Sequence, residues 1–296
     1  MKKPNQEAHI MRTIGTLVRA TRKQLGLVQL SVAKRLALTQ SALSRIESGL
    51  QVMTAPQWAE FCSFTGISPE CIMTGYIEFL RPAVLESAKQ KIPFAMPAKY
   101  LDDRGSKVRA TLPMTKFFKS HYGQDGFEKY CKTNKIDPDF FVNLDNQINV
   151  DFSFDMVDFL RQKGHLKAAD IVKMTKPVSR PEMHGRLQHA YGSIGPNVAG
   201  LMTAFATHSL YYDCNFRYAV EEVGRKHIDI SIRPEAHVWE KLRNMDSDTA
   251  EFISKYRQHY CERFASYGSD HVPQIEHRES FFKGAEQCLY RVELAA

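Results

Sequence analysis

The chain has 296 residues, a length that favours two domains, because single hydrophobic cores stop growing near about 250 to 300 residues. It is 43% hydrophobic and 25% charged, which is the composition of a soluble globular protein and excludes an intrinsically disordered one. The formal net charge is +7, and the first 75 residues hold nine Lys and Arg against four acidic residues, so most of the excess lies in the first quarter.

This local excess of positive charge fits a polyanionic partner such as nucleic acid, because cations that neutralise phosphates release condensed counterions. Surface cations that only keep the chain soluble are the alternative. The six cysteines form no CxxC pair, which favours reduced, buried thiols over a zinc site. No apolar run has signal-peptide or membrane-spanning length, so we expect a cytoplasmic protein with no metal and no cofactor.

The first quarter carries the pattern of three successive helices. Apolar residues at helical spacing predict an amphipathic helix over 10–25, followed by a short helix over about 28–36. Thr39 is placed to cap a third helix, and Gly49 to end it. The polar face of the first helix is basic and carries Arg12, Arg19, Arg22 and Lys23.

The third helix has two different faces. Ala42, Leu43 and Ile46 are expected to face inward. A helix about 10 to 12 Å across fits the major groove of B-DNA, which is about 12 Å wide. The outward face carries side chains that can reach base edges, namely Gln40, Ser41, Ser44 and Arg45.

The stretch "GLVQLSVAKRLALTQSALSRIESG" at 26–49 resembles the helix-turn-helix of the Cro and phage-repressor type, the Xre family. The resemblance is carried by Gly26, Leu27, Gln29, Ala33, Leu36, Thr39, Gln40, Ser44, Arg45, Ile46, Glu47 and Gly49. It implies an all-α, five-helix DNA-binding domain over residues 1–75, with Thr54 and Ser68 as caps of the fourth and fifth helices.

The same resemblance implies how the domain meets double-stranded DNA. Gln29 and Thr39 would touch the sugar-phosphate backbone. Arg can pair bidentately with guanine and Gln with adenine. The residues that would approach bases are Gln40, Ser41, Ser44 and Arg45.

Three residues depart from the pattern of the family. Val28 replaces the usual Thr, and Leu30 replaces a usual acid, which would mark a contact with another part of the chain. Ala37 replaces the usual turn Gly and would strain the turn by about 1 kcal/mol if the backbone there is left-handed.

Residues 76–97 are predicted to form a linker with a short helix that begins at Pro82 and continues through Lys91. The apolar side of this helix would pair with its copy in a dimer or lie against a neighbouring domain, and the sequence favours neither alternative.

The remaining residues, 98–296, predict an α+β domain with an antiparallel sheet. Alternating Ile228, Ile230 and Ile232 indicate a half-buried strand in a hairpin that turns at Gly224, and two more strands meet around Gly284. Helical patterns cover about 114–134, 151–163, 166–175, 183–213 with an interruption near Gly192 and Pro196, and 247–266 with Ser247 or Asp248 as its cap.

A second resemblance concerns the end of the chain. Gly284, Cys288 and Tyr290 are placed as in vinyl-reductase-like ligand-sensing domains and their heme/nitric-oxide-binding relatives, and residues 192–224 are similar to the effector domain of some AraC-type regulators. Both resemblances imply that this domain senses a small molecule. Its ligand-binding residues stay unknown.

Single residues of this domain invite sharper hypotheses that we weigh against structural roles. His184 and His189 are too far apart around a helix to share a metal and are expected at the surface or in caps. His208 and Cys288 are expected in the core. A cluster of aromatic residues would line a ligand cavity or form an ordinary core, namely Tyr211, Tyr212, Phe216 and Tyr218.

Together these patterns predict a multidomain, DNA-binding transcriptional regulator and no enzyme. A homodimer is expected, because two small DNA-binding domains, called heads below, discriminate between sequences better than one. On a palindromic site their two half-sites lie about 34 to 36 Å apart. An effector would act by changing the arrangement of the heads. The alternatives are a regulator controlled by a protein partner, as in antitoxins, and an enzyme fused to a helix-turn-helix domain.

Overall fold

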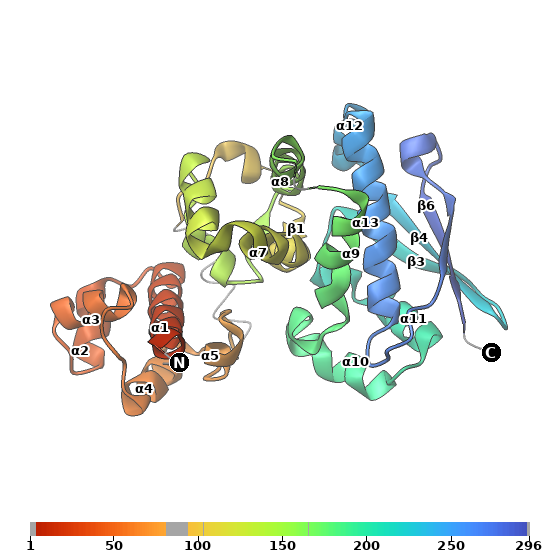
Figure 1. Cartoon of the computed structure of the whole chain (residues 1–296). Coiled ribbons are helices and arrows are strands. Elements are labelled where there is room, and N and C mark those ends of the chain that lie inside the picture. Colours follow the sequence, from red (N-terminus) through yellow and green to blue (C-terminus); the bar gives the residue numbers. More distant parts are fainter. Residues whose placement is uncertain (1–3, 81–93, 103, 165, 295–296) are drawn as a thin grey trace. The chain divides into compact units, whose positions relative to one another are not determined.

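The structure is a computed structural model that describes residues 4–80, 94–102, 104–164 and 166–294 (Figure 1). It has helices alone in the N-terminal part and helices with an antiparallel sheet in the C-terminal part. This multidomain layout confirms the fold class predicted from the sequence.

Contacts between Cα atoms divide the chain into two compact units. The first unit holds 1–97 and 128–146, and the second holds 98–127 and 147–296. The sequence did not suggest that residues 128–146 would return to the first unit. The division into 1–75, 76–97 and 98–296 stays a prediction, and the predicted linker helix from Pro82 to Lys91 lies outside the described residues.

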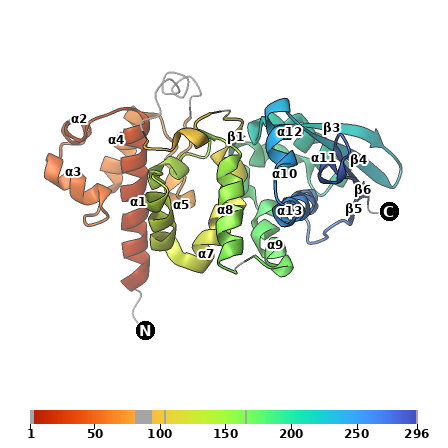
Figure 2. The ribbon, with the colours of Figure 1, turned by 90° about the horizontal axis from the view of Figure 1, so that it is seen from above.

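The first unit is built around one long helix, with α2 and α3 together on one side of it (Figures 1 and 2). Leu17, Leu43 and Phe61, from three different helices, have no exposed surface and form part of the shared core. The described helices of this unit are α1 (Pro4–Gln24), α2 (Gln29–Arg35), α3 (Gln40–Glu47), α4 (Ala55–Thr65) and α5 (Cys71–Thr74).

The helix caps in this unit are confirmed with one exception. Thr54 begins α4 in a capping box with Gln57, each side chain bonding the backbone of the other. Ser68 was wrongly predicted to cap the fifth helix. Its hydroxyl accepts a hydrogen bond from the Glu70 amide at 3.2 Å, and α5 begins only at Cys71, so Ser68 forms a turn before the helix.

The second unit contains a four-stranded antiparallel sheet in the order β3-β4-β6-β5. Helix α13 crosses the sheet (Figure 1), and α11 packs against β3, β4 and α13. The sheet strands are β3 (Phe216–Val223), β4 (His227–Pro234), β5 (Ile275–Glu279) and β6 (Cys288–Glu293), and β1 (Ser106–Lys107) and β2 (Gln147–Ile148) form a separate pair. Helix α7 (Val108–Thr133, kinked at Gly123) belongs to this unit as far as residue 127, and its last residues count with the first unit. The other helices of the second unit are α8 (Asp151–Gln162), α9 (Ala168–Thr175), α10 (Gln188–Ile194), α11 (Val198–Thr207), α12 (Ala236–Arg243) and α13 (Ser247–Ala265).

The predicted hairpin at Gly224 and the paired strands around Gly284 are confirmed. Strand β4 is buried on both faces, so the prediction of a half-buried strand was wrong. Asp229 tolerates burial because Arg291 of β6 donates two hydrogen bonds to its carboxylate, at 2.8 and 2.7 Å.

Two points about the helices of the second unit need correction. The cap of α13 is Asp246, whose carboxylate accepts a hydrogen bond from the Thr249 amide at 3.0 Å, and not Ser247 or Asp248. Helix α12 was missed. The predicted interruption of 183–213 near Pro196 is confirmed, because α10 ends at Ile194, Gly195 takes a positive φ of 66°, and α11 begins at Val198.

Ala37, in the turn between α2 and α3, has a strained backbone conformation whose cost can be measured by mutation. Ala37 has a φ of 53°, the left-handed conformation that costs a residue with a Cβ about 1 to 2 kcal/mol. Ala37→Gly should therefore raise the free energy of unfolding of the first unit by about 1 kcal/mol, measured by urea denaturation.

The matched control is Ala59→Gly, at an exposed position inside α4. There the backbone is helical, so glycine should lower the free energy of unfolding by about 1 kcal/mol. Equal effects of both substitutions would show that the turn stores no strain.

Candidate nucleic-acid interface

Helix α3 presents a polar edge to solvent. Thr39 caps it by accepting a hydrogen bond from the Ala42 amide at 3.1 Å, as predicted, and Leu43 and Ile46 are buried on the opposite side. Gly49 ends the segment with a φ of 69°. The exposed residues are those expected to approach bases, namely Gln40, Ser41, Ser44 and Arg45.

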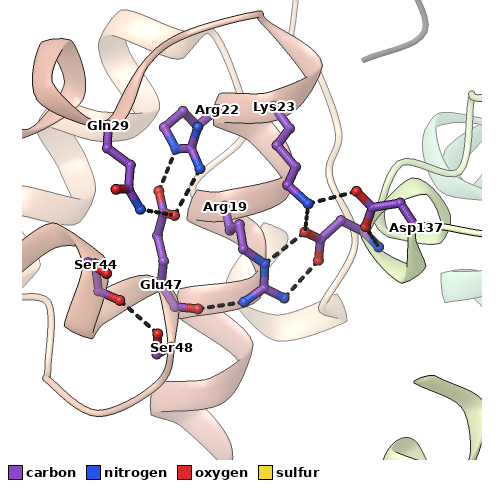
Figure 3. A network of polar contacts seen from close by, with 9 residues as sticks. Arg19, Arg22, Lys23, Gln29, Ser44, Glu47, Ser48 and Asp137 are labelled. Atoms are coloured by element: carbon purple, nitrogen blue, oxygen red, sulfur yellow. Dashed lines mark hydrogen bonds and ion pairs between the residues drawn. The ribbon is translucent and has the colours of Figure 1, made fainter. Parts of the chain in front are cut away.

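One buried carboxylate ties α3 to both neighbouring helices (Figure 3). Glu47, at the end of α3, is 3% exposed. Arg22 of α1 donates from Nε to its Oε1 at 2.6 Å and from Nη2 to its Oε2 at 3.0 Å. Gln29 of α2 donates to Oε2 at 2.9 Å. Such a bidentate pair sets orientation as well as distance, so it fixes the angle at which α3 is held.

The backbones of α1 and α3 also approach closely. A Cβ at position 15 would collide with the carbonyl oxygen of Ile46, so only glycine fits in α1 at this point. Arg19 donates a hydrogen bond to the Glu47 carbonyl at 2.6 Å and thereby satisfies one of the carbonyls left open at the end of α3. These contacts make the three helices one rigid support.

Of the basic face predicted for α1, Arg12 is exposed, whereas Arg19, Arg22 and Lys23 are paired with acidic side chains. Arg19 pairs with Asp139 in two hydrogen bonds of 2.7 Å, and Lys23 bonds Asp137 at 2.7 Å and Asp139 at 2.8 Å. Burial acts to raise the pKa of Asp139, but the hydrogen bonds from Arg19 and Lys23 outweigh it and hold the pKa below its usual range.

The predicted backbone-contacting residues fall in different environments. Gln29 is half-buried and its amide is engaged with Glu47, whereas Thr39 is exposed. Their contacts with phosphate stay predictions. Val28 and Leu30 are 62% and 47% exposed, and the contact of Leu30 with another part of the chain stays a prediction.

The second unit contains a cavity of about 90 Å³, measured as the space that the centre of a water-sized sphere can reach. One wall is α13, which contributes Tyr256, Arg257 and Tyr260. Of the aromatic cluster noted in the sequence, Tyr212 and Tyr218 line the cavity. Most of the other lining side chains are apolar and include Met114, Val157, Phe205, Ile232 and Phe252.

The histidines and cysteines of this unit have different surroundings, and Cys214 is exposed. His184 was expected at the surface or in a cap; it follows a short 3-10 turn but is fully buried, with Nδ1 2.9 Å from the Tyr212 hydroxyl oxygen and Nε2 2.7 Å from the Val178 carbonyl oxygen. Burial lowers the pKa of His184 to about 4, so the ring is neutral near pH 7. Cys288 is buried as expected, and burial raises its pKa. His189 is exposed.

Comparison with known proteins bears on the first unit only. A family model described as a helix-turn-helix domain matches residues 13–71, which span α1 to the start of α5. The chain therefore carries an N-terminal helix-turn-helix domain, the hallmark of a DNA-binding regulator. No curated protein and no solved structure matches the chain. None of the described helices is long and apolar enough to cross a membrane.

The Glu47 network predicts a large loss of stability when the carboxylate is removed. Glu47→Ala leaves the Arg22 guanidinium, whose side chain is 14% exposed, without its carboxylate partner, and should lower the free energy of unfolding by about 3 to 5 kcal/mol in urea denaturation. Glu60→Ala is the control, because Glu60 pairs with Arg35 at 2.8 Å on the surface and its loss should cost less than about 1 kcal/mol. A small effect at Glu47 would contradict its role as the tie between helices.

Because Arg45 lies on the exposed edge of α3, its substitution is expected to reduce discrimination between DNA sequences and to leave the fold intact. Arg45→Ala should weaken binding to a preferred duplex by about 1 to 3 kcal/mol, measured by fluorescence anisotropy. Arg45→Lys keeps the charge but not the planar fork, so it should retain affinity for random-sequence DNA and lose most of the preference. Unchanged preference in Arg45→Ala would contradict a base-reading role.

Proposed function

We propose that this protein is a sequence-specific, DNA-binding transcription regulator of the Xre type. The observation that carries the proposal is the exposed polar edge of α3, held by the buried Glu47 on a domain that matches helix-turn-helix proteins. In this account Gln40, Ser41, Ser44 and Arg45 contact bases, and Gln29 and Thr39 face the sugar-phosphate backbone.

The regulator is proposed to act as a homodimer. A single α3 reaches few base pairs, and with Arg19 and Lys23 held by Asp137 and Asp139, one head has little free positive charge on α1. Two heads on a two-fold symmetric site, with half-sites about 34 to 36 Å apart, double both the base contacts and the phosphate contacts.

The second unit is proposed to sense a small molecule. Its cavity of about 90 Å³ supports this function over control by a protein partner, which would need an exposed apolar surface and no cavity. Burial raises the pKa of Cys261, which lines the cavity, to about 12, so this thiol stays protonated and is not an activated nucleophile.

Selection from a random duplex library with the full-length chain tests the proposal. We expect enrichment of a two-fold symmetric sequence whose half-sites lie about 10 base pairs apart. Sedimentation of the complex should give a protein mass of twice 33.9 kDa. Enrichment of no shared sequence would overturn the regulatory function, and a single asymmetric half-site would overturn the dimer.

A further inference from the structure

The cavity of the second unit holds a permanent cation. Arg257 of α13 lines the cavity, and its Cζ lies 3.5 Å from the centre of the Phe216 ring. A guanidinium stays protonated in proteins, so burial does not remove its charge. The ring of Phe216 supports one face of the cation and fixes its position.

This cation is only partly satisfied by the protein. Among the residues that the structure describes, no carboxylate lies within 4.0 Å of Arg257, and its Nε has no hydrogen-bond partner. The hydroxyl of Tyr218 lies next to the Arg257 side chain. Asp213 also lines the cavity and its charge attracts Arg257, but no hydrogen bond or ion pair within 4.0 Å joins the two side chains. The Oδ1 of Asp213 accepts hydrogen bonds from the Ser106 hydroxyl at 3.2 Å and the Asn215 backbone amide at 2.9 Å, which hold the carboxylate in the turn before β3.

A second donor without a partner lies beside Arg257. The buried hydroxyl of Tyr256 lines the same cavity and has no hydrogen-bond partner among the described residues. Buried polar groups are normally paired, so two such donors in one cavity point to an acceptor that arrives from outside the chain. A carboxylate accepts from both, because its two oxygens offer about four acceptor sites.

Most of the cavity wall is apolar or aromatic, with serine hydroxyls at some points of the lining. Phe205 and Phe252 face the space together with Met114 and Ile232. A water molecule needs about 10 to 15 Å³ of space measured in this way, so about 90 Å³ has room for several waters or for one small organic molecule. The apolar share of the wall favours an organic molecule, because water gains no hydrogen bonds from that share.

We propose that the effector of this protein is a small organic acid, with its carboxylate on Arg257 and Tyr256 and its apolar body between Phe205 and Phe252. This inference rests on the proposed sensing function and names the chemical class of the ligand. Charge-assisted hydrogen bonds to Arg257 give the specificity, and burial of the apolar body gives the remaining affinity.

Binding of matched probes to the full-length chain, without DNA, tests the inference by isothermal titration calorimetry. The probes are benzoate, phenylacetate and octanoate, each beside its neutral amide, with benzylamine as a cation. We expect at least one acid to bind about 10-fold or more tightly than its amide. Arg257→Gln should abolish that preference, and Tyr256→Phe should reduce it while leaving amide binding unchanged.

Lys255→Gln is the control, because Lys255 lies two residues away on the same helix, exposed and paired with Glu251. It should bind every probe as the natural chain does. The inference is overturned if no acid exceeds its amide, if benzylamine binds best, or if folded Arg257→Gln keeps the preference. These outcomes leave the DNA selection untouched, so failure of the ligand class and failure of the regulatory function are distinguishable.

Discussion

The helix-turn-helix unit depends on the hydrogen bonds that Arg22 of α1 and Gln29 of α2 donate to the buried Glu47 carboxylate. Burying a charge is costly unless its partners are well placed, and here the bidentate geometry meets that condition. This geometry fixes the orientation of α3. With Glu47 fixed and Gly15 admitting the Ile46 carbonyl, α3 has one position relative to α1, and its polar edge faces outward.

The segment 128–146 extends this support from a distant part of the sequence. Asp139 and Asp137 hold Arg19 and Lys23, and Arg19 in turn bonds the carbonyl of Glu47. The far ends of the segment continue into the second unit along the chain.

Local patterns were enough to predict α2, α3, the Thr39 cap and the exposed edge from Gln40 to Arg45, because helical periodicity and caps act within a few residues. The sequence singled out Ala37 as a site of strain only if its backbone were left-handed, and the φ of 53° meets that condition. Partners such as Arg22 with Glu47 and Arg19 with Asp139 are 25 and 120 residues apart, and no local pattern pairs them. The cavity around Arg257 was missed for the same reason, since five or more separate elements build it.

The central claim is that the exposed edge of α3 meets the bases of duplex DNA. Mapping of backbone amide chemical shifts in the isotopically labelled full-length chain, with and without the selected duplex, tests it most directly. The account predicts the largest shift changes at residues 40–45, with smaller changes at Gln29 and Thr39. Large changes confined to other surfaces, with residues 40–45 unaltered, would contradict it.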